Sequence, residues 1–186
     1  MAARSPDHGF AHRPARLDDV PALKHLMQSA IAELQKGFLS AAEIAASSDV
    51  MGLDTQLITD GTYFVIEDGG EIAGCGGWSR RATLFGGDHS AGRDAALLDP
   101  AKDAARVRAM YTSPAFARRG VGRLILALCE AAAAREGFTR VELGATRAGE
   151  PLYRACGYAP IEAIAAPTSS GVTIPILRMG KALAPR

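Results

Sequence analysis

The 186-residue chain has little aromatic content, few cysteines and no excess of either charge. Aromatic residues make up 6%, and 21 Lys plus Arg nearly balance 20 Asp plus Glu, giving a formal net charge of +1. A balance this even gives no chain-wide reason to expect nucleic acid as a partner, although it leaves room for a local basic patch. The apolar fraction of 48% is typical of a globular core. The length favours a single domain over residues 1–186.

Long apolar runs and metal-binding patterns are also missing. No stretch of about 18 apolar residues occurs, so we expect no membrane span and no membrane partner. Residues 1–9 are polar and lack the apolar middle of a signal peptide, which predicts a flexible tail and a cytoplasmic protein. The three cysteines, Cys75, Cys129 and Cys156, are unevenly spaced and are expected to be reduced thiols. No Cys/His cluster has metal-ligand spacing, so no metal is predicted.

The hydrophobic pattern predicts a mixed order of strands and helices, with hairpins at the ends and β–α–β crossovers between them. We expect helices at 20–34, 40–46, 55–59, 120–136 and 150–155. We expect strands at 10–14, 62–67, 71–78, 106–111, 139–145, 159–165 and 172–179, the last interrupted by Pro175. Three glycines in 71–78, Gly74, Gly76 and Gly77, indicate a bulge or a close approach by another segment. The stretch 79–105 reads as a long mixed-charge loop, either functional or simply solvated.

Residues 117–123, Ala-Arg-Arg-Gly-Val-Gly-Arg, carry the clearest chemical signal. Gly120 and Gly122 let the backbone turn tightly and approach a ligand closely. The first N–H groups of the following helix are unpaired and the helix dipole favours an anion, so we expect a phosphate or pyrophosphate to bind there. A Walker loop would need Gly-Lys-Ser/Thr, and a Rossmann fingerprint would need a third glycine at Ile125. An ordinary helix start with solvated arginines stays open as the alternative.

Two motifs in the right order resemble a known family. The strand at 106–111, Ser113-Pro114 and the segment 117–126 together resemble motif A of the GNAT superfamily of N-acetyltransferases, whose pattern is Gln/Arg-x-x-Gly-x-Gly/Ala. Gly120 and Gly122 match its small positions, whereas Ala117 departs from the usual Gln or Arg. The later stretch 151–158, Pro-Leu-Tyr-Arg-Ala-Cys-Gly-Tyr, resembles motif B. The resemblance covers residues 106–158.

This resemblance implies the GNAT fold, an α/β (α+β) architecture with a mixed twisted sheet of about six to seven strands flanked by helices on both faces. It implies acetyl-CoA as cosubstrate, held between two diverging strands. The pantetheine arm would pair with backbone at Met110, Tyr111 and Thr112. The pyrophosphate would lie on the amides of the next helix start, with the cofactor-binding set Arg118, Arg119, Gly120, Val121, Gly122 and Arg123.

The implied activity is acetyl transfer to a primary amine of a small-molecule or peptide acceptor, by direct attack in a ternary complex. The family places a tyrosine near the CoA sulfur, which assigns Tyr153 the protonation of the leaving thiolate. Two alternatives stay open. One is a catalytically silent GNAT-fold module that binds or senses an acyl-CoA. The other is a different phosphate-ligand protein whose arginines hold a nucleotide.

The acceptor side carries little pattern. Glu33 and Trp78 are our candidate substrate-binding residues, although core packing is the favoured reading for Trp78. The general base is not readable from the sequence: a water relay is one reading, and the side chains considered are Glu33, Asp88, His89 and Asp94. Arg80 and Arg81 would favour an acceptor with a carboxylate. The oligomeric state stays open; in a homodimer, the strand containing Pro175 could contribute to the interface.

Overall fold

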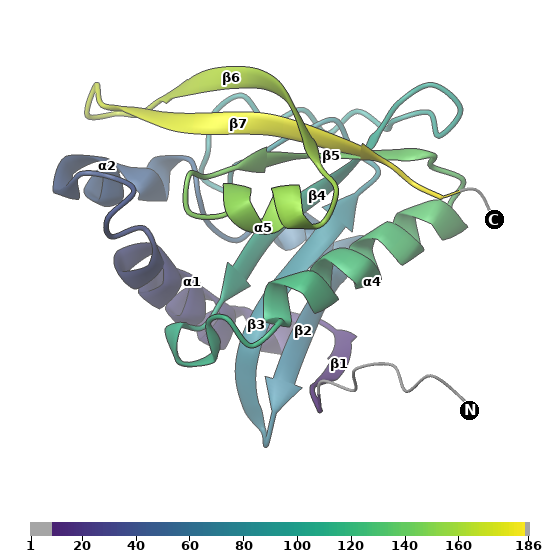
Figure 1. Ribbon diagram of the computed structural model, residues 1–186, viewed down its shortest axis with the longest axis horizontal. Helices are drawn as coiled ribbons and strands as arrows, with labels where there is room; N and C mark the ends of the chain where they lie inside the picture. Colours follow the sequence, from purple (N-terminus) through teal and green to yellow (C-terminus); the bar gives the residue numbers. More distant parts are fainter. Residues whose placement is uncertain (1–8, 185–186) are drawn as a thin grey trace.

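The computed structural model describes residues 9–184, and over this range one seven-stranded sheet has the order β1-β2-β3-β4-β5-β7-β6 (Figure 1). The predicted tail at 1–9 lies, except for Gly9, outside the described residues. The strands are β1 Ala11–Pro14, β2 Tyr63–Asp68, β3 Glu71–Ser79, β4 Ala105–Thr112, β5 Arg140–Ala145, β6 Ala159–Pro167 and β7 Thr173–Ala182. The α-helices are α1 Val20–Leu34, α2 Ala41–Ala46, α3 Thr55–Thr59, α4 Val121–Arg135 and α5 Glu150–Ala155.

The pairing pattern confirms the expected GNAT-type α/β arrangement. Strands β1 to β4 pair antiparallel in sequence order, and β5, β7 and β6 form a second antiparallel group. The only parallel pair in the described chain joins β4 to β5 across the crossover helix α4. Helices cover both faces, because α4 packs with Ile66 of β2 while α1 packs with Val65, the next residue, which points the opposite way. No helix among residues 9–184 is long and apolar enough to cross a membrane.

The glycines of β3 are explained by close packing. A Cβ on Gly74 would lie 2.5 Å from the Val121 side chain, and one on Gly76 would lie 2.6 Å from Ile125. A Cβ on Gly77 would lie 2.5 Å from the carbonyl oxygen of Thr62. The predicted close approach is therefore confirmed: α4 rests directly on the bare backbone of β3. This contact fixes where the first turn of α4 lies relative to the sheet.

The last two strands differ from their predicted bounds. Strand β7 runs without a break through Pro175, which is paired with Ala165 of β6. Pairing between β7 and β5 ends at Leu177 opposite Ala145, so Pro175 lies beyond β5 and needs no ladder donor on that side. In the folded chain β7 is an inner strand rather than an edge strand. The homodimer stays a prediction.

The loop between β3 and β4 packs against the sheet although it holds no named helix or strand. The side chain of Arg108, 3% exposed on β4, donates hydrogen bonds to the carbonyls of Thr83 (3.2 Å) and Gly86 (2.7 Å). The same guanidinium pairs with Asp54 at 3.1 Å. These contacts hold the loop segment 83–86 against β4. Of the two readings of residues 79–105, a purely solvated excursion is therefore wrong.

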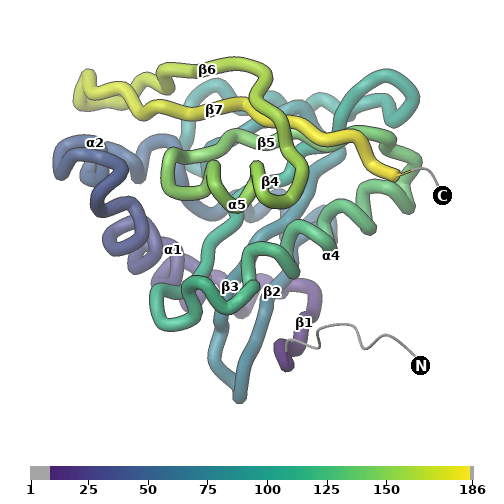
Figure 2. Tube along the Cα trace, in the orientation of Figure 1, coloured from purple at the N-terminus to yellow at the C-terminus, as the bar shows by residue number. Residues whose placement is uncertain are grey.

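The segment around α2 lies beside the tip of the β6–β7 hairpin, although the two are far apart in sequence (Figure 2). Helix α2 begins with the predicted capping box, in which Ser40 Oγ accepts from the Glu43 amide at 3.2 Å and the Glu43 carboxylate accepts from the Ser40 amide at 2.7 Å. At the hairpin tip, the Ser169 amide donates to the Asp49 carboxylate at 2.7 Å. These contacts place residues after α1 next to β7.

Candidate functional site

Strands β4 and β5 separate soon after they begin to pair. Their parallel pairing is limited to Ala105 opposite Val141 and Arg106 opposite Glu142. Further along, β4 carries an irregularity against β3, and Ala109 has φ of +49°. Non-glycine residues rarely adopt this conformation, so surrounding contacts must hold it. The Tyr63 hydroxyl, donating to the Ala109 carbonyl at 2.7 Å, supplies one such contact.

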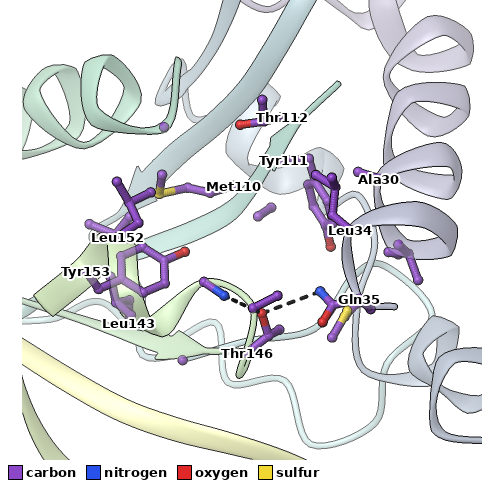
Figure 3. Close-up of a pocket in the computed structure, with 18 of the residues that line it drawn as sticks. Ala30, Leu34, Gln35, Met110, Tyr111, Thr112, Leu143, Thr146, Leu152 and Tyr153 are labelled. Atoms are coloured by element: carbon purple, nitrogen blue, oxygen red, sulfur yellow. Dashed lines mark hydrogen bonds between the residues drawn. The ribbon is translucent and has the colours of Figure 1, made fainter. Parts of the chain in front are cut away.

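A cavity of about 790 Å³ occupies the gap between the two strands (Figure 3). One end, which we call the α4 side, is lined by residues 117–123 apart from Arg119 and by residues of α5. The opposite end, the α1 side, is lined by Ala30, Ile31, Leu34, Gln35, Phe38, Val50, Met51, Gly52, Leu84, Phe85, Gly86 and Ile176. The predicted pantetheine positions Met110, Tyr111 and Thr112 line the middle.

The start of α4 has the geometry of an anion site. Arg118 has φ of +65° and Gly120, the N-cap, has φ of +90°, so the chain makes two left-handed steps before the helix begins. The first amides of this 15-residue helix have no intrahelical acceptor, and the helix dipole is positive there. Arg118 and Arg123 are among the residues that line the cavity, and neither forms an ion pair with any described residue. Two uncompensated cations therefore belong to this end.

The third arginine has a different environment. Arg119 pairs with Asp68 at 2.9 Å, and its guanidinium lies 4.9 Å from the ring centroid of Phe116 and 5.4 Å from that of Phe10. Its side chain does not line the cavity. The structure thus places two of the three predicted arginines at the cavity and leaves the third outside it.

Gly122 serves packing between two helices. A Cβ at this position would lie 2.6 Å from the Leu152 side chain of α5, and Val121 is 1% exposed against β3. Besides its predicted role in close approach to a ligand, Gly122 thus lets α5 dock on the first turn of α4. The position of Tyr153, one residue after Leu152, depends on this contact.

Tyr153 projects from α5 with its hydroxyl toward the cavity interior (Figure 3). Its ring lies edge-on to Tyr158 at a centroid distance of 6.0 Å. A Cβ on Gly149 would lie 2.9 Å from the Tyr153 ring, so the bare glycine makes room for the ring. Burial raises the pKa of Tyr153 to about 12. The phenol therefore stays protonated at neutral pH.

Tyr111 has a side-chain role that the sequence did not indicate. Its hydroxyl accepts a hydrogen bond from the Gly52 amide at 2.8 Å. Burial raises the pKa of Tyr111 above its ordinary value. The contact ties the segment 50–52 to β4 and so helps to form the wall of the α1 side. The family resemblance implies only a backbone contact of Tyr111 with the pantetheine arm.

The predicted acceptor residues lie outside the cavity. Glu33 pairs with Lys36 at 2.7 Å on the exposed face of α1, and Trp78 is 2% exposed in the core with Phe138 edge-on at 6.0 Å. None of the following lines the cavity, and each side chain has a partner elsewhere: Arg80 with Glu136, Arg81 with Asp60, Asp88 with Thr55, His89 with the Ser48 carbonyl, and Asp94 with the Ala96 amide. Core packing is the reading that the structure supports for Trp78.

Three polar residues of the cavity were not predicted from the sequence: Gln35, Arg108 and Thr146. Gln35 follows directly after the apolar face of α1 and is 8% exposed. Its Nε2 donates to Thr146 Oγ1 at 3.4 Å, which links the end of α1 to the end of β5. A polar side chain at a position where helical spacing predicts burial was the signal available. Among residues 9–184 no group of three His, Cys, Asp or Glu side chains is arranged to hold a metal ion.

Solved structures share this fold at low sequence identity. A GCN5-related N-acetyltransferase from Rhodopseudomonas palustris matches with a TM-score of 0.69 at 17% identity, over 98% of this chain and 99% of that one. A Salmonella typhimurium structure, described as an acetyltransferase with its cofactor acetyl-CoA, has a TM-score of 0.62 at 16% identity over 95% of each chain. The PaiA N-acetyltransferase from Thermoplasma acidophilum, in complex with coenzyme A, has a TM-score of 0.60 at 13% identity, over 93% and 98%.

A search of curated protein sequences found no significant match. The family model described as the acetyltransferase (GNAT) family matches residues 24–158, well over half of the chain. This range contains both sequence motifs, the splayed strands β4 and β5, and the helix start at Gly120. The resemblance seen in the motifs is thereby confirmed, and the chain belongs to the GNAT family of acetyltransferases.

Proposed function

We propose that this enzyme transfers an acetyl group from acetyl-CoA to a primary amine, by direct attack in a ternary complex. The observation that carries the proposal is one continuous cavity between β4 and β5, which joins a helix start with free amides to a protonated tyrosine. The Salmonella structure with acetyl-CoA and the Thermoplasma structure with coenzyme A support the choice of cosubstrate.

The α4 side suits the CoA pyrophosphate. Its negative charges would meet the free amides of the first turn of α4 and the unpaired cations of Arg118 and Arg123. The pantetheine arm would run along the edge of β4 at Met110, Tyr111 and Thr112, where β5 has diverged and left the strand edge unpaired. Backbone pairing of this kind needs no particular side chains.

The reaction needs one bond to form and one to break. The amine nitrogen attacks the thioester carbon, the C–S bond breaks, and the nitrogen loses one proton while the sulfur gains one. Tyr153 donates its proton to the departing sulfur and recovers a proton from solvent. A CoA thiol has an ordinary pKa near 8.5. The burial that raises the pKa of Tyr153 would also raise the pKa of a thiol beside it, so the pKa values of the proton donor and the proton acceptor stay comparable.

Deprotonation of the incoming amine is not assigned to a side chain of this cavity. No Asp, Glu or His among the described residues lines it. A lysine-like amine with a pKa near 10.4 would cost roughly 4–5 kcal/mol to deprotonate at pH 7. The site therefore needs an amine that arrives neutral, having lost its proton to solvent.

Two measurements test the proposal. Calorimetric titration with CoA and with ATP at equal ionic strength should give binding for CoA at least tenfold tighter, because ATP has no pantetheine arm to occupy the β4 edge. Thiol release from acetyl-CoA should then increase when a panel of primary amines is added. Tight CoA binding without acetyl transfer to any amine would contradict this proposal and would favour the catalytically silent module that binds or senses an acyl-CoA.

A further inference from the structure

The α1 side of the cavity is walled by one of the molecule's apolar clusters. Val50, Met51 and Ile176 are each less than 8% exposed, and Ile31 and Phe85 pack against them. These five residues come from α1, the segment after α2, the loop before β4, and β7, and all five line the cavity. A ligand at this end therefore meets aliphatic and aromatic carbon on several sides.

The charge of the cavity has one sign. The ionisable side chains that line it are Arg108, Arg118, Arg123, Tyr111 and Tyr153, and no Asp, Glu, His or Lys of the described chain lines it. The nearest buried carboxylate, Asp54, is already paired with Arg108 at 3.1 Å and with Arg93 at 2.5 Å. A cationic ammonium in this end would be desolvated and would have no lining carboxylate to pair with.

Gln35 supplies an unused hydrogen-bonding atom at this end. Its Oε1 is buried and has no partner, while its Nε2 donates to Thr146 Oγ1 at 3.4 Å (Figure 3). Turning the amide over would let the Thr146 hydroxyl donate to the oxygen and would leave the NH₂ unpaired instead. In both orientations one buried polar atom lacks a partner, which costs free energy unless a ligand satisfies it.

Resting on the proposed acetyl transfer, we propose that the acceptor is a small apolar primary amine that is uncharged at neutral pH, of the aromatic-amine type, and that Gln35 Oε1 accepts a hydrogen bond from its N–H. The bond leaves the nitrogen lone pair free for attack and stabilises the positive charge that develops on nitrogen. The apolar wall receives the body of the acceptor, and no general base is required.

The first test compares amines at pH 7 with saturating acetyl-CoA. Aniline-type amines should react with kcat/KM at least about a hundredfold above benzylamine, spermidine and a lysine-containing peptide with a blocked N-terminus, because these are almost entirely cationic at this pH. For benzylamine, kcat/KM should rise about tenfold per pH unit and level off only at the amine's own pKa. A preference for spermidine, for the peptide or for any other cation at pH 7 would overturn the inference.

The second test isolates Gln35. Gln35→Met keeps the side-chain length but removes the acceptor atom, and should lower kcat/KM for the aromatic amine about tenfold to a hundredfold through both kcat and KM. The KM for acetyl-CoA should change by less than about twofold, because Gln35 is on the opposite side of the cavity from α4. Gln28→Met, on the exposed face of the same helix, is the matched control and should behave as wild type.

The outcomes distinguish failure of the proposed acetyl transfer from failure of the proposed acceptor class. If acetyl-CoA neither binds nor turns over with any amine, the proposed function fails. If cationic amines are acetylated efficiently, or if Gln35→Met leaves the amine's kcat/KM unchanged, the acetyl transfer stands and the acceptor class is wrong.

Discussion

The two ends of the cavity are built in opposite ways. The anion site of the α4 side is made from one short segment within residues 117–123, with free backbone amides and two unpaired arginines. The α1 side is made from residues of four separate segments, with apolar walls and one unpaired amide oxygen on Gln35. A charged, invariant group such as a pyrophosphate can be bound by backbone amides, whereas a variable ligand needs side chains, which several loops can supply independently.

The largest expected effect is on acetyl-CoA binding at the α4 side. Replacing Arg118 and Arg123 together by Ala should raise the KM for acetyl-CoA about a hundredfold at low salt, since each loses a charge-assisted contact with phosphate. Because both side chains are exposed, the effect should shrink as ionic strength rises. Arg119→Ala is the control, with a KM within about threefold of wild type. An equal loss in Arg119→Ala would show that the arginines act only through overall charge.

A smaller effect should follow from Gly122→Ala, which alters the contact between α4 and α5. The added Cβ would lie 2.6 Å from the Leu152 side chain and should shift α5. We expect kcat to fall about tenfold, because Tyr153 moves with the helix, while the KM for acetyl-CoA changes less. Adding Leu152→Ala should recover part of the lost kcat in the double variant. Failure of that second change to recover any activity would contradict the packing explanation.

Removing the Tyr63 hydroxyl tests the bulge that opens the cavity between its two ends. Tyr63→Phe leaves the Ala109 carbonyl without its 2.7 Å donor, which should lower the free energy of unfolding by about 1–2 kcal/mol. Turnover should fall severalfold, since the strained Ala109 is then held less firmly. Chemical denaturation and initial rates measure the two effects. Unchanged stability with unchanged turnover would mean that other contacts fix the bulge.

The smallest expected effect is in the pH profile with a neutral aromatic amine. Tyr153 acts as a protonated phenol, and its raised pKa keeps it protonated up to about pH 12, so activity should not fall between about pH 7 and 10. With no carboxylate or imidazole lining the described cavity, no acid limb should appear above about pH 6 either. A titration midpoint inside this window would reveal a base or acid that the structure places elsewhere.

The same contrast explains what the sequence could predict. The sequence of strands and helices along the chain and the helix start at Gly120 depend on local periodicity and on short motifs, and they appear in the structure as expected. The helices on both faces of the sheet are implied by the family resemblance and are also observed. The unbroken course of β7 through Pro175 could not be predicted in this way. Pro175 lies outside the pairing with β5, and only the register of the folded sheet shows this position.

The acceptor residues could not be predicted for a similar reason. Glu33 and Gln35 are two positions apart on α1, yet one faces solvent and the other the cavity, and the difference depends on where β5 brings Thr146. Trp78 looked like a cleft residue beside a glycine-rich strand, but α4 and Phe138 cover it. Such choices depend on contacts between segments distant in sequence, which carry no local pattern.

The most direct test of the central claim is the kinetics of Tyr153→Phe, with Tyr158→Phe as the matched control, since the Tyr158 hydroxyl donates to Glu130 outside the cavity. If the cavity transfers acetyl groups with Tyr153 as proton donor, kcat should fall about a hundredfold or more while the affinity for CoA, measured by calorimetry, stays within about threefold. The control should keep both values. A Tyr153→Phe enzyme with wild-type kcat on its best amine would contradict the account.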